Sequence, residues 1–80
     1  MRLDKFLKVS RIIKRRTVAQ DFAEAGRVIV NGRGAKPSTA VKVGDTIVIT
    51  AGSRETAYEI LEISDNIRAE LAHTMYRIIE

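Results

Sequence analysis

Cysteine is absent from this chain of 80 residues, and several other residue types are rare in it. Without a thiol the chain can form neither a disulfide framework nor a thiolate metal site. It has one proline, one histidine and no tryptophan. Its longest apolar run is far too short to cross a membrane, and no secretory leader opens it. These absences exclude a disulfide-rich secreted domain, a zinc finger and a membrane-spanning protein, and they leave a soluble module of the cytoplasm as the expectation.

Side chains that could perform catalysis are also scarce. A lone histidine, His73, cannot build a metal site with other nitrogen ligands, and no serine has a base at a motif spacing. The acids of the N-terminal part are scattered rather than paired, which leaves general acid–base catalysis without support. These acids are Asp4, Asp21, Glu24 and Asp45. We therefore expect a binding protein without enzymatic activity, cofactor or metal.

The charged residues are distributed unevenly, although the net charge is only +4. Residues 1–50 contain eleven basic and four acidic side chains, a net charge of +7. Residues 51–80 contain three basic and six acidic ones, a net charge of −3. Within residues 1–16, seven basic residues accompany a single acid. Positive charge concentrated at one end of a small domain points to a polyanionic partner.

Apolar spacing predicts a first helix near the N-terminus, because Leu3, Phe6 and Leu7 share one helical face. Residues 9–16 follow, and basic and apolar residues are mixed there. That stretch could be a continued helix or an irregular basic link, and the pattern does not separate the two.

A second helix is predicted over residues 18–25. Thr17 and Gln20 match a capping box, in which each side chain would satisfy a free backbone donor at the helix start. Gly26 stands where a left-handed residue ends many helices.

Beyond the second helix the apolar pattern changes to the period of a β-strand. The dipeptide Asn31-Gly32 is a strong hairpin signal, because both positions tolerate positive φ. Pro37 confines the returning strand to an edge. The predicted strands are residues 28–30, 33–36, 46–50 and 56–63.

The C-terminal tail is ambiguous. Leu71, Met75, Ile78 and Ile79 follow helical spacing, and Asp65 could cap such a helix. Met75 to Ile79 is also compatible with a short edge strand. One α+β domain over residues 1–80, with a short C-terminal helix, accounts for all of these elements.

The informative candidate site is a run of basic residues, which we call the basic cluster. Lysine and arginine neutralise phosphates and release counterions, and arginine can also bind a phosphate with two N–H groups. Two other interpretations stay open: an ordinary solvated helix face, and a basic helix lying on an anionic membrane. The members of the basic cluster are Arg2, Lys5, Lys8, Arg11, Lys14, Arg15 and Arg16.

The few aromatic residues bear on the kind of partner. Phe6 and Phe22 fall on predicted core faces, so no aromatic platform for stacking nucleobases is evident. Recognition by shape and phosphate is therefore expected, and structured RNA suits that mode better than single strands.

The order of motifs between Arg2 and Ile49 resembles the S4-type (αL) RNA-binding domain family. The matching runs are residues 2–7, 16–19, 26–32, 36–38 and 43–47. The resemblance implies two N-terminal helices packed on a small, strongly bent antiparallel sheet. Residues 2–49 would then be the core motif, and residues 50–80 a C-terminal strand and tail. It also implies that the two helices and the following loop present basic side chains to structured ribosomal or transfer RNA.

Within that family the chain is similar to the small bacterial ribosome-associated quality-control factors that stabilise P-site tRNA. The similarity lies in residues 2–11, residues 13–17 and the pair Met75-Tyr76, whereas residues 71–74 depart from the pattern. It implies binding to a large ribosomal subunit obstructed by an unfinished nascent chain, with contacts to P-site tRNA and large-subunit rRNA. It further implies support for C-terminal alanine tailing, with the alanine-tailing protein on the same subunit as another partner. We expect the chain itself to be a monomer.

The resemblance also implies roles for individual residues. Arg2 and Arg16 match paired RNA contacts of the family. Asp4 matches an acid that could equally hold Arg2 or a helix N-terminus in place. The other members of the basic cluster are expected to contact phosphates as a group. The predicted RNA-binding residues are therefore Arg2, Asp4, Lys5, Lys8, Arg11, Lys14, Arg15, Arg16 and Thr17.

Three other functions remain open from the sequence. The chain is also similar to the heat-shock ribosome-binding proteins, which carry a longer basic tail and act on the large subunit. It could be a detached RNA-targeting module of an RNA-modifying enzyme, such as a pseudouridine synthase. It could also bind a membrane surface or act as a chaperone-like binder.

Overall fold

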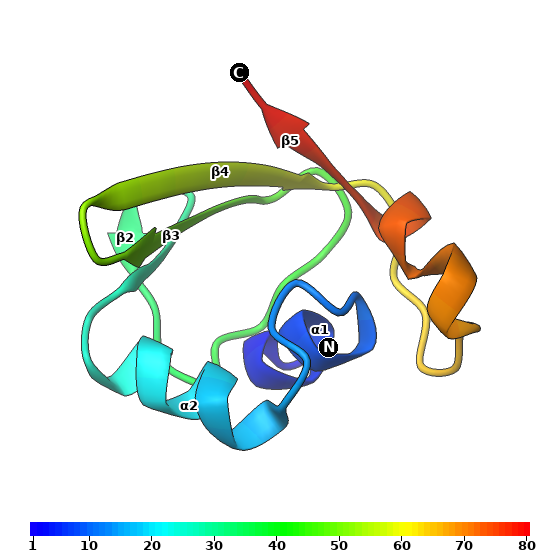
Figure 1. The fold of residues 1–80 in the computed structure, drawn as a ribbon, viewed down its shortest axis with the longest axis horizontal. Helices are drawn as coiled ribbons and strands as arrows, with labels where there is room; N and C mark the ends of the chain where they lie inside the picture. The colour runs from blue at the N-terminus through cyan, green and yellow to red at the C-terminus, as the bar shows by residue number, and fades with distance from the viewer.

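Two short helices cover one face of a five-stranded antiparallel sheet (Figure 1). The computed structural model describes residues 1–80. The strands lie in the order β2-β1-β3-β4-β5, and a 3-10 helix, η1, precedes the last strand. The elements are α1 (Leu3–Val9), α2 (Arg16–Glu24), β1 (Val28–Val30), β2 (Arg33–Gly34), β3 (Thr46–Ala51), β4 (Arg54–Ile60), η1 (Ala69–Met75) and β5 (Tyr76–Ile79). The predicted α+β class is confirmed.

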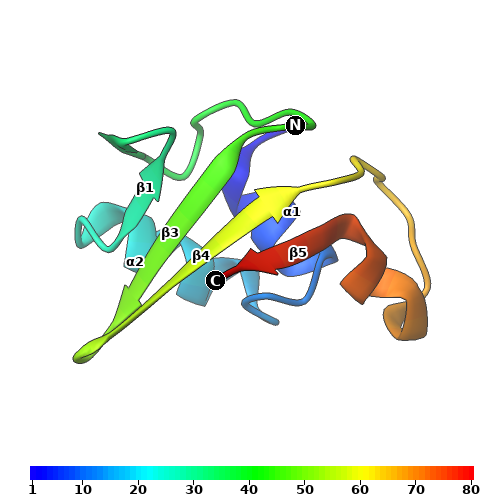
Figure 2. The same ribbon diagram turned by 90° about the horizontal axis from the view of Figure 1, so that it is seen from above.

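The core lies between the helices and the sheet. Figure 2 shows the sheet from its other side, where no helix covers it. The predicted apolar face of the first helix is confirmed, because Leu3, Phe6 and Leu7 are fully buried. They pack with buried side chains of the strands and of η1, among them Ile60 and Met75. Full burial of one such side chain contributes about 1.5–3 kcal/mol, so α1 is a principal anchor of the domain.

The second helix begins two residues before its predicted start, and its predicted capping box is wrong. Thr17 lies inside the first turn, and the N-cap residue, Arg15, makes no side-chain capping bond. Gln20 does not reach back to the helix start, because its Nε2 donates to the carboxylate of Asp4 at 2.9 Å. A buried charged acceptor binds an amide more strongly than a solvated backbone group does.

The end of α2 agrees with the prediction. Gly26 has a φ of 76°, in the left-handed region. Its N–H donates to the carbonyl of Ala23 at 3.1 Å, and the N–H of Arg27 donates to the carbonyl of Phe22 at 3.0 Å. This pair of bonds is the Schellman motif, and it satisfies carbonyls that the helix end leaves free.

The strands are close to those predicted. Asn31 and Gly32 have φ values of 51° and 80°, and Val30 pairs with Arg33, so the predicted hairpin is confirmed. The return strand β2 is shorter than expected. Strand β4 begins earlier than predicted because Ala51 pairs with Arg54 across a tight turn. Strand β4 ends at Ile60, three residues before its predicted end, where the chain leaves the sheet.

The tail combines both alternatives that the sequence left open. The expected C-terminal helix is present as the 3-10 helix η1, and Arg68 rather than Asp65 precedes it. The edge strand is also present, because β5 pairs antiparallel with β4. Residues 10–15, between the two α-helices, form an irregular link, in which Arg11 has a φ of 63°.

The left-handed end of α2 gives a stability prediction. Gly26→Ala should lower the free energy of unfolding by about 1 kcal/mol, because an L-residue is disfavoured at that φ. Urea unfolding followed by circular dichroism measures the change. Gly34→Ala is the matched control: neither position has an atom within 4 Å of an added Cβ, and Gly34 lacks the positive φ. Equal losses in both variants would contradict the argument.

Candidate nucleic-acid interface

The candidate site is organised around the carboxylate of Asp4, in the first turn of α1. This side chain is completely buried and accepts hydrogen bonds from five donor groups. Arg2 donates from Nε to Oδ1 at 3.2 Å and from Nη2 to Oδ2 at 3.3 Å. Arg16 donates from Nη2 to Oδ1 at 3.3 Å. The remaining donors are Gln20 Nε2 at 2.9 Å and the backbone N–H of Lys5 at 2.8 Å.

These contacts determine the charge state of Asp4. Burial by itself would raise the pKa of the carboxyl. The hydrogen bonds from Gln20, Arg16, Arg2 and the Lys5 backbone outweigh burial and lower the pKa from 3.8 to about 2. Asp4 is therefore a carboxylate at neutral pH. Because its side chain is buried, Asp4 can contribute to a binding surface only by positioning the residues that it holds.

The partners of Asp4 remain available to solvent. The side chains of Arg2 and Arg16 are 52% and 42% exposed. The backbone of Arg2 is also held, because Leu3 N–H donates to the carbonyl of Thr39 at 2.8 Å and Arg2 bridges to Ala40. The structure thus brings together the two arginines predicted as paired contacts and fixes both of them through one acid.

The rest of the basic cluster lies on α1 and on the link between the helices. Lys5 is half-buried and pairs through Nζ with Asp65 Oδ1 at 2.9 Å. This contact, together with the Lys5 charge, lowers the pKa of the Asp65 carboxyl. The other members are exposed and form no ion pair. Thr17, at the start of α2, is exposed as well. These exposed members are Lys8, Arg11, Lys14 and Arg15.

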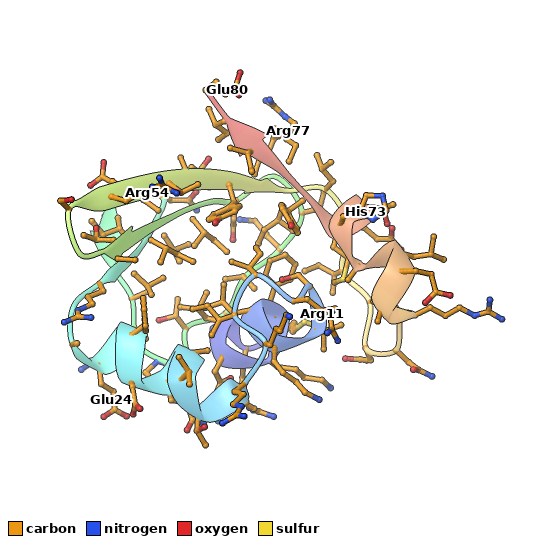
Figure 3. The ribbon with its side chains drawn as sticks, in the orientation of Figure 1. Arg11, Glu24, Arg54, His73, Arg77 and Glu80 are labelled. Carbon is orange, nitrogen blue, oxygen red and sulfur yellow. The ribbon has the colours of Figure 1, made fainter.

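Arg11 occupies an unusual backbone position at the end of α1. Its φ of 63° places it in the left-handed region, where glycine is the favoured residue. Its N–H donates to the carbonyl of Lys8 at 3.0 Å, and Ser10 Oγ donates to the carbonyl of Leu7 at 3.3 Å. These bonds turn the chain out of the helix and present Arg11 to solvent, as Figure 3 shows below the sheet.

Two features of this surface were missed in the sequence. The first is Gln20, which donates the remaining side-chain hydrogen bond to Asp4. The sequence did hint at this role, because Gln20 lies one turn after Arg16 on the same face of α2. A groove of about 660 Å³ lies beside Arg2, between the end of α2 and the loop that carries Lys36. Its lining includes Glu24 as well, so the groove is mixed in charge.

One acid of the C-terminal part, Glu59, is paired with a base outside this surface. Arg77 pairs with Glu59 across β4 and β5, and Arg77 lies near the C-terminal end of the sheet in Figure 3. The structure has no group of three or more histidine, cysteine, aspartate or glutamate side chains that could hold a metal ion. None of its helices has the length and apolar character that a membrane crossing requires.

Chemically, this surface suits a polyanion. Exposed guanidinium and ammonium groups extend from α1 through the link to the first turn of α2, and a single buried acid fixes two of them. Such an array binds phosphates and releases counterions, whatever the sequence of the nucleic acid.

Comparison with known proteins agrees with this chemistry. The family model described as "S4 domain" matches residues 1–47, which include both α-helices and the whole basic cluster. The chain belongs to the S4 domain family.

Relatives of this S4 domain are similar over nearly their whole length. The RQC P-site tRNA stabilizing factor of Listeria monocytogenes is 54% identical over 80 residues, which are 100% of this chain and 87% of that protein. The factor of the same name from Halalkalibacterium halodurans is 51% identical, over 98% of this chain and 89% of that protein. The trimeric structure of Vibrio cholerae Heat Shock Protein 15 aligns with a TM-score of 0.89 at 40% identity, covering 99% of this chain and 81% of that one.

The buried carboxylate of the S4 domain predicts a pH dependence of stability. The folded pKa of Asp4 lies below the ordinary value of 3.8, so its contribution is fully present above pH 4 and is lost as the pH falls toward 2. The difference corresponds to about 2 kcal/mol. In urea unfolding between pH 5 and pH 2, wild type should lose about that much more stability than Asp4→Asn. Asp21→Asn, at an exposed position on α2, should keep the wild-type pH dependence, and a wild-type profile in Asp4→Asn would contradict the assignment.

The left-handed Arg11 allows charge and fold to be separated. Arg11→Gly should hold or raise the free energy of unfolding, by up to about 1 kcal/mol, because glycine is unstrained there. The same variant should bind RNA more weakly and lower the slope of log affinity against log salt by about one. Arg11→Ala should lose the same binding without the gain in stability. An unchanged salt slope in both variants would remove Arg11 from the interface.

Proposed function

We propose that this chain is an RNA-binding factor without enzymatic activity that acts in ribosome-associated quality control by stabilising P-site tRNA. The relatives that are about half identical over the full chain carry that function in their names. The basic cluster supplies the matching chemistry, because tRNA and rRNA both present closely spaced phosphates. A ribosome-bound role would place the protein in the bacterial cytoplasm.

The observation that carries the proposal is the arrangement around Asp4. One buried carboxylate holds Arg2 and Arg16 side by side while leaving about half of each side chain exposed. Pre-positioned guanidinium groups lose less conformational entropy on binding than free ones do. This geometry supports recognition of a fixed pair of phosphates on a folded RNA.

The finer part of the proposal concerns the particle that is bound. We infer that the chain binds a large subunit obstructed by a nascent chain, with the basic cluster shared between P-site tRNA and large-subunit rRNA. In this role it supports C-terminal alanine tailing next to the alanine-tailing protein. The similarity of residues 2–11 and 13–17 to quality-control factors supports this, as does the extent of the basic cluster over two helices and a link. The direct RNA contacts we propose are those of the basic cluster and Thr17, with Asp4 as their positioning residue.

A second candidate function is that of a heat-shock-type large-subunit binder. The fold similarity to the Vibrio cholerae protein favours it, at a TM-score of 0.89 and 40% identity. Deleting the gene and assaying C-terminal alanine tails on stalled peptides separates the two functions. Loss of the tails supports the quality-control role, and unchanged tails with impaired subunit recovery after heat shock supports the alternative.

The proposed function predicts a specific effect at Arg16. Arg16→Ala should reduce the fraction of protein that comigrates with large subunits in sucrose gradients about tenfold, because a charge-assisted contact to phosphate is lost. Asp4 keeps its other donors, so the variant should remain folded by circular dichroism. Arg68→Ala is the control, because Arg68 is 80% exposed and makes only a long 3.8 Å pair with Glu70. Equal comigration of both variants at physiological salt would show that the basic cluster is not the interface.

A further inference from the structure

An apolar groove of about 290 Å³ opens beside the basic cluster, and we call it the aromatic groove. The link between the helices and the C-terminal part of α2 form one side of it, and the hairpin of β3 and β4, distant in sequence, forms the other. Six of its eight lining residues are hydrophobic, and none is acidic. The lining residues used below are Ile12, Ile13, Phe22, Arg54, Thr56 and Tyr58.

The walls of the aromatic groove are built before any ligand arrives. Ile12, Ile13, Phe22 and Tyr58 are half-buried and pack against the hydrophobic core. Tyr58 is further held by an edge-to-face contact with Tyr76, with ring centroids 5.5 Å apart. The groove therefore presents two aromatic rings from different elements in fixed positions. The sequence concealed this pair, because Phe22 and Tyr58 are far apart in the chain.

Positive charge surrounds this apolar surface. In the link, Ile12 and Ile13 are flanked in sequence by two members of the basic cluster, Arg11 and Lys14. Arg54 lines the groove from the start of β4, and Figure 3 shows Arg54 on the hairpin and Arg11 on the link. Arg27 lies over Phe22, with its guanidinium carbon 5.6 Å from the ring centroid. An apolar, aromatic floor inside a cationic rim complements a nucleotide, whose flat base is joined to a phosphate.

The size of the groove limits what it can hold. A volume of about 290 Å³ lies at the lower end of ordinary ligand pockets, which span about 300–1,000 Å³. It accommodates one planar ring system and not the apolar face of a helix, which needs several adjacent side-chain positions.

We propose that the aromatic groove receives one unstacked nucleobase of the bound RNA while the neighbouring phosphates lie on the basic cluster. The inference rests on the proposed RNA-binding function and deepens it. Recognition then combines phosphate contacts with one inserted base, so an RNA with an unpaired residue is preferred over an uninterrupted duplex.

Fluorescence titration with two RNA probes of equal phosphate number tests the inference. One is a hairpin with 2-aminopurine at an unpaired position, and the other is a duplex with 2-aminopurine in a pair. Wild type should bind the hairpin about tenfold more tightly, because stacking one base contributes that much. Thr56→Phe fills the groove and should remove the preference while leaving duplex binding within twofold. Thr50→Phe is the matched control, because Thr50 lies next to groove-lining Ile49 on β3 and does not line the groove.

The outcomes separate the inference from the proposed function. No binding of wild type to either probe would overturn both. Equal binding of both probes, or an equal effect of the two phenylalanine variants, would overturn the inference alone. Binding of an uncharged leucine-rich peptide that Thr56→Phe blocks, with RNA binding unaffected, would assign the groove to a protein segment and also overturn it.

Tyrosine fluorescence gives a second readout that does not depend on filling the groove. The chain has two tyrosines and no tryptophan, so Tyr76→Phe leaves Tyr58 as the sole emitter and keeps an aromatic ring beside it. Saturation with the unlabelled hairpin should quench Tyr58 emission, and the unlabelled duplex should not. Emission that is insensitive to saturating hairpin would contradict insertion of a base beside Tyr58.

Discussion

The buried carboxylate of Asp4 is the constraint on which the functional surface depends. A charge without solvent access costs several kcal/mol unless it is fully paired, and Asp4 is paired with five donor groups from both helices and from the residue before them. Two of those donors are the backbone N–H of Lys5 and the side-chain amide of Gln20. The other three belong to the guanidinium groups of Arg2 and Arg16, whose side chains are about half exposed. The same acid therefore joins α1 to α2 and orients the arginines.

The rest of the structure makes this surface possible in a very small domain. The sheet buries the apolar face of α1, so Lys8 and the basic residues of the link are left exposed. The left-handed residue Arg11 turns the chain and keeps the link between the helices short. Acids of the C-terminal part are partly neutralised locally, as in the pair of Glu59 with Arg77. Positive charge is concentrated where the helices meet, and an apolar groove opens beside it.

Local signals predicted much of the fold, and long-range contacts account for what they missed. The hairpin at Asn31-Gly32 and the helix end at Gly26 follow from local backbone preferences, and the structure confirms both. The capping box at Thr17 was wrong because Gln20 has a better acceptor in Asp4, on another helix. The tail formed a 3-10 helix followed by an edge strand because the free edge of β4 takes up β5. The basic cluster was visible from composition, whereas the aromatic groove was not, since its two rings come to line one groove only in the folded chain.

A cross-linking map on isolated large subunits that carry P-site tRNA tests the central claim most directly. Photoreactive groups would replace Lys8 and Arg15 in the basic cluster, and Glu62 and His73 in the acidic C-terminal part, one at a time. The first pair should cross-link to P-site tRNA and to large-subunit rRNA, and the second pair should yield little RNA adduct. RNA adducts that arise mainly from Glu62 and His73, with none from the basic cluster, would contradict the interface described above.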